Sequence, residues 1–278
     1  MIVISRNLVV SPTEAALPPG TPWIGWQNIV TATNVSSVTS ADAQHPISLV
    51  ANPFTHLQWI SGVNTGDEYI TIGPLTLTDP IDYVGVARHN FGTTRSIISI
   101  EGIPDPGASP QWVELVQGQI LPNDSPVIFR FTPQILTGVR LRIQPGASNV
   151  HRAAVVYVGK LLLMERGVKI DVDHVPLPYG RKAKIATGFS ESGNYMGRIV
   201  TQESRESKAN FAHITPTWYR AKLDPFIAAS KQQPFFWAWN PSEYPLETGY
   251  CWMVNEPVPA TSPVTRRVSI DLEMRGVI

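Results

Sequence analysis

Between residues 28 and 164, apolar and polar positions alternate in short runs, most clearly at residues 68–72, 95–101 and 139–143. Turn residues interrupt the pattern every 8–15 positions, and no helical periodicity occurs in this stretch. A period of two places successive side chains on opposite faces of a strand. The pattern therefore predicts an antiparallel β-sandwich or barrel, in which each sheet has one buried face and one wet face.

After about residue 165 the pattern predicts a smaller α+β unit. Thr215 followed by Pro216 is a helix start, because a hydroxyl cap and a proline both suit a first turn. The helix is expected to run for about four turns. Strands are expected at residues 184–187, 197–202, 234–239, 250–254 and 266–274. The predicted fold class is mainly β, a jelly-roll sandwich plus a smaller α+β unit with one main helix.

The aromatic run at residues 234–239 is bulky at both parities of a strand. A single small sheet has one interior, so the second face needs a helix, the other domain or a neighbouring subunit to cover it. We predict a subunit interface at Phe235, Phe236, Trp237 and Trp239.

Three segments are expected along the chain. Residues 1–27 read as a strand, 1–11, followed by a linker rich in proline and glycine, and the strand can pair with the C-terminal unit. Residues 28–164 are the predicted sandwich, and residues 165–278 are the predicted α+β unit.

The charge composition limits which classes of partner are expected. Basic and acidic residues balance at 22 each, which gives no reason to expect a nucleic acid or an anionic membrane as partner. Only 16% of residues are charged, against about 25% in an average soluble domain. Much of the surface is hidden in an assembly, or the chain is an all-β protein with many proline-rich turns. No apolar run is long enough to span a bilayer, and no signal peptide is recognisable.

No pattern of catalytic or metal-ligating residues emerges. The six histidines are scattered, without a partner at ligand spacing, and the single cysteine, Cys251, lies in an apolar strand as an inert thiol. Serines 190 and 192 lie between glycines, but not in a nucleophile motif. We expect no enzyme, no metal and no cofactor. If the chain binds a glycan or a partner loop, the candidate contacts are Trp23, Trp26, His89 and Asn90.

The order of motifs in the first half resembles the discoidin-like, or galactose-binding-like, jelly roll. The resemblance rests on Thr31-Ala32-Thr33, residues 56–61, Phe129-Arg130-Phe131 and residues 139–143, and it covers about residues 28–164. The cysteine pair that flanks this domain in the family is absent, which fits a cytoplasmic origin.

The second half resembles the tail-tube-like domain of siphophage distal tail and baseplate proteins, through residues 234–241, 250–254 and 266–277. The resemblance implies a split barrel, a ring of identical subunits with sixfold symmetry, other tail and baseplate proteins as partners, and a place at the tail tip of a virion made in the host bacterial cytoplasm. Many distal tail proteins carry their second domain after the ring domain, whereas here the sandwich precedes it or is inserted. The alternative function is a carbohydrate-binding or receptor-binding module.

Overall fold

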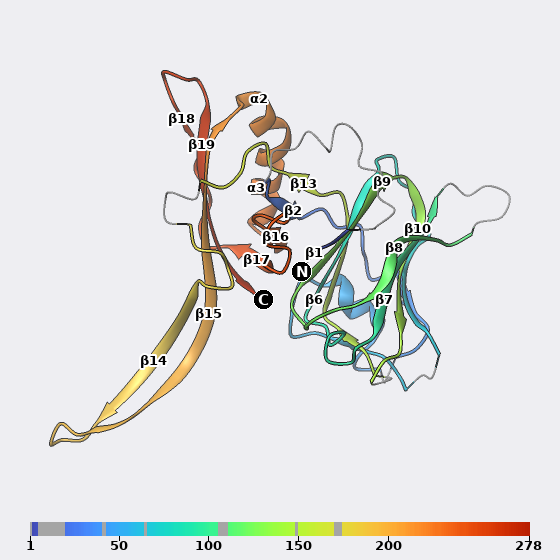
Figure 1. Ribbon diagram of the computed structural model, residues 1–278, viewed down its shortest axis with the longest axis horizontal. Helices are drawn as coiled ribbons and strands as arrows, with labels where there is room; N and C mark the ends of the chain where they lie inside the picture. Colours follow the sequence, from blue (N-terminus) through green and yellow to red (C-terminus); the bar gives the residue numbers. More distant parts are fainter. Residues whose placement is uncertain are drawn as a thin grey trace.

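The structure, a computed structural model, describes residues 2–4, 20–40, 43–63, 66–104, 111–147, 150–169 and 174–278. Two β-rich units lie side by side, a sandwich and a C-terminal unit with the helix (Figure 1). The predicted fold class, mainly β with a jelly-roll sandwich and a smaller α+β unit, is confirmed.

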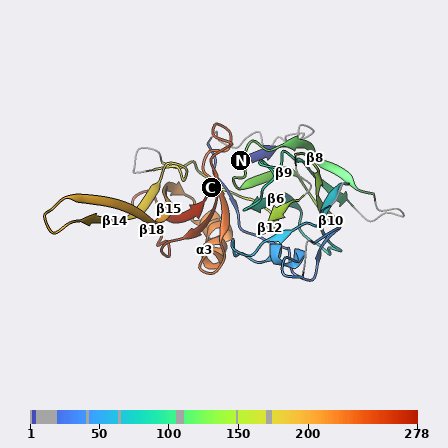
Figure 2. The same cartoon turned by 90° about the horizontal axis from the view of Figure 1, so that it is seen from below.

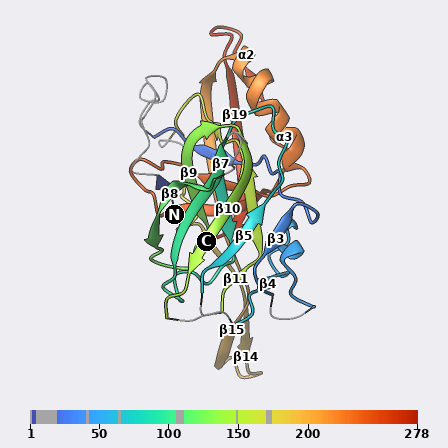
Figure 3. The same ribbon diagram turned by 90° about the vertical axis from the view of Figure 1, so that its right-hand side faces the viewer.

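Two antiparallel sheets build the sandwich, apart from one parallel pair at an edge. The first has the order β1 (Ile2–Ile4), β9 (Val127–Gln134), β6 (Ile81–Ala87), β12 (Val155–Gly159). The second, seen face-on in Figure 3, has the order β3 (Val35–Ser37), β5 (Glu68–Ile72), β10 (Leu136–Gln144), β7 (Ile97–Pro104), β8 (Val113–Ile120). A short pair, β4 (Trp59–Ile60) with β11 (Arg152–Ala153), and the 3₁₀ turn η1 (Ile47–Ala51) close one end.

The alternation read from the sequence explains how these sheets bury one face. In β5 the side chains of Glu68, Ile70 and Ile72 are buried, while Tyr69 and Thr71 between them are half-buried. The strands β6 and β12 are buried along their whole length, because the second unit covers the outer face of their sheet. Continuous apolar strands are the expected consequence of cover on both faces.

The C-terminal unit is one long sheet with a helix on one face. Its order is β13 (Leu162–Leu163), β2 (Trp23–Gly25), β16 (Phe235–Ala238), β17 (Thr248–Met253), β19 (Val268–Val277), β15 (Tyr195–Ile214), β14 (Arg181–Phe189), and β18 (Ala260–Thr261) pairs with β19. The helical segment runs through α2 (Pro216–Trp218), the π-helical turn η2 (Tyr219–Leu223) and α3 (Asp224–Ser230), as the sequence predicted. The ring of Phe226 meets that of Phe235 edge-on at 5.0 Å, which fixes the helix over the sheet.

The helix start differs from the expectation in one detail. The hydroxyl of Thr215 makes no cap hydrogen bond to the helix. Instead, the Glu165 carboxylate accepts bonds from the Thr215 N–H at 2.7 Å and the Thr215 hydroxyl at 2.9 Å. The Glu165 carboxylate therefore holds the N-cap residue itself and does not bond the N–H groups of the first turn.

The segment expected to be a linker contributes strands to both units. Residues 2–4 pair in parallel with β9 of the sandwich, so the predicted pairing of the first strand with the C-terminal unit is wrong for these residues. Trp23–Gly25 lies instead between β13 and β16. Since Ile24 pairs with Leu162, the sandwich is inserted between two neighbouring strands of the C-terminal sheet. Residues 5–19 lie outside the described residues.

The aromatic run is covered by its own chain. Phe235, Trp237 and Trp239 face the helix side, and Phe236 and Ala238 face the sandwich. The four residues predicted as a subunit interface are at most 7% exposed. That prediction is wrong, because the inserted sandwich supplies the second cover. The expectation that this strand needs cover on both faces is confirmed.

Candidate functional site: a projecting arm and a polar pocket

A two-stranded arm projects from the C-terminal unit, away from the sandwich and from the helix (Figures 1 and 2). It consists of β14 and the first half of β15, joined by a turn in which Gly193 adopts a positive φ of 81°. All nine residues of β14 are exposed. The sequence predicted strands at residues 184–187 and 197–202, but not that both faces of the pair would lie exposed.

Apolar side chains occupy both faces of this arm. Phe189, Met196 and Ile199 are 64%, 73% and 70% exposed. The cross-strand pairs Ile185 with Val200 and Phe189 with Tyr195 lie on one face, and the pair Ala186 with Ile199 lies on the other. A two-stranded hairpin has no interior of its own, and an isolated one is marginally stable in water. The arm thus presents apolar surface that the described part of the chain leaves uncovered.

Ion pairs hold the arm at its root. Glu206 on β15 receives the Lys182 ammonium from β14 and the Arg275 guanidinium from β19. The Lys182 and Arg275 side chains, in that order, lower the pKa of the Glu206 carboxyl. One carboxylate therefore ties the outermost strand to the third strand of the sheet.

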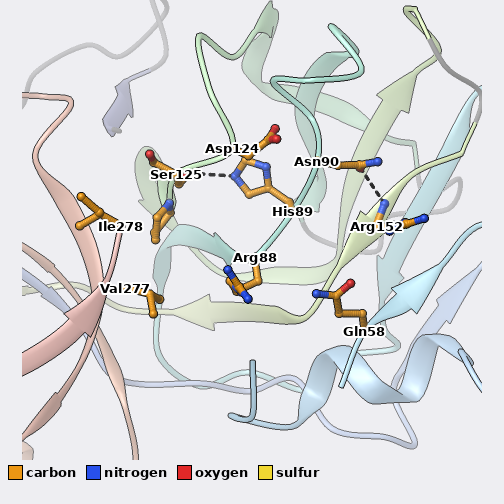
Figure 4. Close-up of a pocket in the computed structure, with 10 residues that line it drawn as sticks. Gln58, Arg88, His89, Asn90, Asp124, Ser125, Arg152, Val277 and Ile278 are labelled. Atoms are coloured by element: carbon orange, nitrogen blue, oxygen red, sulfur yellow. Dashed lines mark hydrogen bonds between the residues drawn. The ribbon is translucent and has the colours of Figure 1, made fainter. Parts of the chain in front are cut away.

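The second feature is a polar pocket at the seam between the two units (Figure 4). Its volume is about 470 Å³, and β6 of the sandwich and β19 of the C-terminal unit both end at its wall. The lining side chains from the sandwich include Gln58, Arg88, His89, Asn90, Asp124 and Arg152, and Val277 and Ile278 line the opposite side.

Two of the predicted glycan contacts, His89 and Asn90, line this pocket, but their side chains are hydrogen-bonded to the backbone of its walls. The Phe91 N–H donates to His89 Nδ1 at 3.3 Å, and His89 Nε2 lies 2.9 Å from the Ser125 carbonyl oxygen. Because Nδ1 accepts and Nε2 donates, the imidazole is neutral. Burial, as the main cause, lowers the pKa of His89 to about 4.

Asn90 cross-links two loops through its amide. Its nitrogen donates to the Val150 carbonyl at 3.0 Å, and its oxygen accepts from the Arg152 N–H at 2.8 Å. Asp124 is similarly occupied, since its carboxylate accepts bonds from the Thr93 N–H and hydroxyl. The pocket is a preformed cavity whose wall residues are already bonded to one another.

Four groups in the lining differ from these wall residues. Among the described residues, the guanidinium groups of Arg88 and Arg152 form no ion pair, and the Gln58 amide and Ser125 hydroxyl have no hydrogen-bond partner. None of these four residues was among the contacts predicted from the sequence. Gln58 and Ser125 lie in separate loops and Arg152 lies in the short strand β11, so only the position of Arg88 beside His89 was a signal.

The other two predicted glycan contacts lie elsewhere. Trp23 is 6% exposed, and the guanidinium of Arg130 covers its ring at 4.5 Å from the centroid, so it belongs to the seam. Trp26 is half-buried beside the helix, with its ring 6.3 Å from that of Phe226. The structure does not bring these two residues together with His89 and Asn90.

The described part of the chain contains no group of three or more His, Cys, Asp or Glu side chains placed to hold a metal ion. In the same residues, no helix combines the length and apolarity needed to cross a bilayer. Cys251 is buried as a free thiol, and burial raises its pKa.

Comparison with known proteins gives limited information. No family model matches the chain, and no curated protein matches it. Among solved structures, it is similar to a chitosan-binding module from a chitosanase/glucanase of Paenibacillus sp. IK-5, with 14% identity and a TM-score of 0.41 over 48% of this chain and 98% of that chain. It is also similar to the family 32 carbohydrate-binding module of NanJ from Clostridium perfringens, in complex with galactose, with 12% identity and a TM-score of 0.39 over 49% and 98%. At these values the likenesses carry no argument about what this chain binds.

Proposed function

We propose that the chain is a structural subunit of a homo-oligomeric assembly, in which the arm of each copy packs against a neighbouring copy. The single observation that supports this most is the bare arm, with apolar side chains on both faces. Full burial of one such side chain contributes about 1.5–3 kcal/mol. Covering Phe189, Met196 and Ile199 in an interface would therefore favour association.

The backbone of the arm supports the same proposal. Among the described strands, β14 is the outermost of its sheet, so its free edge presents N–H and C=O groups that none of these strands pairs. Such an edge can accept a strand from another chain by β-augmentation. We take the partner to be a second copy, because most soluble oligomers are closed assemblies of identical subunits and the low charge content suits a largely covered surface.

The more specific proposal follows the sequence resemblance of the C-terminal unit. The assembly would be a ring of six subunits at the distal tail or baseplate of a siphophage virion, assembled in the host bacterial cytoplasm. The sandwich would then face outward and dock other baseplate or fibre proteins. In this role the chain performs no catalysis, binds no cofactor and contacts neither nucleic acid nor membrane.

The test is the mass of the purified full chain, measured by light scattering and analytical ultracentrifugation. We expect a discrete oligomer, and we expect the double variant Phe189→Ser, Ile199→Ser to be monomeric and still cooperatively folded. The control is Val258→Ser, because Val258 is 80% exposed but lies off the arm. A wild-type chain that stays monomeric at high concentration would overturn the proposal.

A second candidate function is carbohydrate binding at the polar pocket. The specific observation in its favour is a preformed cavity in which two guanidinium groups have no ion pair, and one amide and one hydroxyl have no hydrogen bond, with any of the described residues. Carbohydrates are recognised by several directed hydrogen bonds of this kind in a concave site. The solved structures similar to the sandwich include modules described as binding carbohydrates, but the proposal depends on the pocket.

A further inference from the structure

We infer that the polar pocket binds an acidic monosaccharide unit, a hexuronate, whose carboxylate pairs with Arg88 and Arg152. The inference rests on the second candidate function, carbohydrate binding at this pocket, and specifies the chemistry of the sugar. It is independent of the arm and of the assembly proposed from it.

The charges facing the cavity favour an anion. Arg88 and Arg152 are permanently charged, and neither has a carboxylate partner among the described residues. Among the described lining residues, the one acidic side chain is that of Asp124, which accepts two hydrogen bonds from Thr93. His89 carries no charge, because both of its ring nitrogens are engaged as in the neutral tautomer. The side-chain charge of the lining is therefore positive.

The backbone conformation of Arg88 and the strand before it place this residue at the pocket wall. Arg88 adopts a φ of 55°, a left-handed conformation that favours glycine or asparagine. It follows directly on β6, so its place at the pocket is fixed by a rigid strand. Residues held in this conformation cluster at functional sites. Arg95 and Arg266 adopt the same conformation outside the lining, so what distinguishes Arg88 is its place in the pocket wall.

The remaining lining indicates a sugar acid rather than a bare anion. A guanidinium offers paired N–H donors that match the two oxygens of a carboxylate. The Gln58 amide and the Ser125 hydroxyl add a donor and acceptor set that suits ring hydroxyl groups. The cavity of about 470 Å³ lies within the usual range for small-molecule sites.

The test is calorimetric titration of the full chain with sodium galacturonate and sodium glucuronate, each compared with galactose, glucose, acetate and inorganic phosphate. We expect both uronates to bind at least about tenfold more tightly than the neutral sugars and than acetate. The neutral sugars lack the carboxylate that makes the charge-assisted bidentate contact, and acetate lacks the hydroxyl groups.

The decisive variant is Arg88→Gly, which removes the guanidinium and suits the backbone. We expect uronate binding to fall at least about tenfold while the melting temperature stays level or rises. The matched control is Arg95→Gly, since Arg95 also has a positive φ, 52°, and is exposed, but does not line the cavity. Arg152→Gln provides a second test of the carboxylate contact, with the Asn90 bond to the backbone of residue 152 retained.

The outcomes separate the inference from the function it rests on. Equal binding of uronates and neutral sugars, unaffected by Arg88→Gly, would overturn the carboxylate contact and leave carbohydrate binding standing. Tight binding of phosphate or acetate without a preference for uronates would replace the sugar acid with a simple anion. Absence of binding by every probe would overturn both.

Discussion

The ring of Phe236 on β16 lies directly over Gly85 on β6. A Cβ atom added at Gly85 would lie 2.7 Å from Cε2 of Phe236, which is shorter than a normal van der Waals contact. Gly85 belongs to the sandwich and Phe236 to the C-terminal sheet, so this contact sets how closely the two units pack. The absence of a side chain at one position makes room for the ring at the other.

Substitution of Gly85 by alanine is therefore expected to destabilise the chain by about 1–3 kcal/mol, as overpacking does in a dense core. Urea denaturation followed by tryptophan fluorescence measures the change. Gly188→Ala is the matched control in a strand, because its new Cβ would meet its nearest atom at 3.8 Å, an ordinary contact. Equal stability of the two variants would show that the seam adapts to an added methyl group.

The seam also contains three buried tyrosines, which predict sensitivity to alkali. The Tyr250 hydroxyl donates to the Pro53 carbonyl at 2.9 Å, and burial raises the pKa of Tyr250, Tyr83 and Tyr157. Their neutral forms stabilise the fold fully below the unfolded pKa of about 10, and this contribution is lost as pH rises further. Each buried phenol adds a slope of about 1.4 kcal/mol per pH unit.

The variant Tyr250→Phe removes the contribution of one phenol to the pH dependence of the unfolding free energy. We expect the variant to lose about 1–3 kcal/mol at pH 7, because the Pro53 carbonyl is left without its donor. Between pH 10 and 11 its stability should fall less steeply than that of the wild type. Denaturation at stepped pH, with phenolate absorbance as a second readout, makes the comparison. Parallel curves for both proteins would contradict the assignment.

His89 predicts a loss of stability in acid. The pKa of His89 in the folded chain is about 4, below the value of about 6.5 expected when unfolded. Its contribution is present above pH 6.5 and is lost as pH falls through the folded value, a total of about 3 kcal/mol. The variant His89→Gln should flatten the stability profile between pH 6.5 and 4, whereas His56→Gln, at an exposed position, should not. An unchanged slope in His89→Gln would show that other groups govern the acid transition.

The strands could be predicted because their signal is local. The alternation at residues 68–72 and 139–143 appears as β5 and β10, and that at residues 266–274 appears as β19. Each pattern lies within one short window, and a strand with one buried face needs nothing more to be recognised. The helix after Thr215 was equally accessible, although its cap was not.

What the sequence could not provide is pairing between distant segments. Trp23–Gly25 is a short strand in a proline- and glycine-rich stretch, and its partners lie more than 130 residues away. The parity of Phe236 correctly predicted a covered second face, but which element covers it depends on the insertion of the sandwich. The pocket is a stronger case, since Gln58, Arg88 and Arg152 meet only through the fold.

The arm provides a last prediction, about its attachment. Glu206 accepts from Arg275 Nε at 3.1 Å and also pairs with Lys182 on β14. Replacing it by glutamine leaves two cations facing each other with a neutral group between them. An exposed ion pair contributes about 0.2–1 kcal/mol, so amide exchange in β14 should quicken roughly twofold to fivefold while global stability hardly changes.

Hydrogen exchange with mass spectrometry measures this, in the background Phe189→Ser, Ile199→Ser so that contacts between copies do not mask the arm. Glu203→Gln is the control, because Glu203 lies on the same strand without an ion pair in the described part of the chain. The pKa of Glu206 is lowered by its partners, so its contribution is present above the ordinary glutamate pKa and is lost as pH falls through the lower value. After correction for intrinsic exchange, the protection of β14 amides should therefore decline as pH falls below the ordinary glutamate pKa in the chain that retains Glu206. It should not decline in this way in Glu206→Gln. Equal exchange in both glutamine variants would show that backbone pairing with β15 is enough to hold the arm.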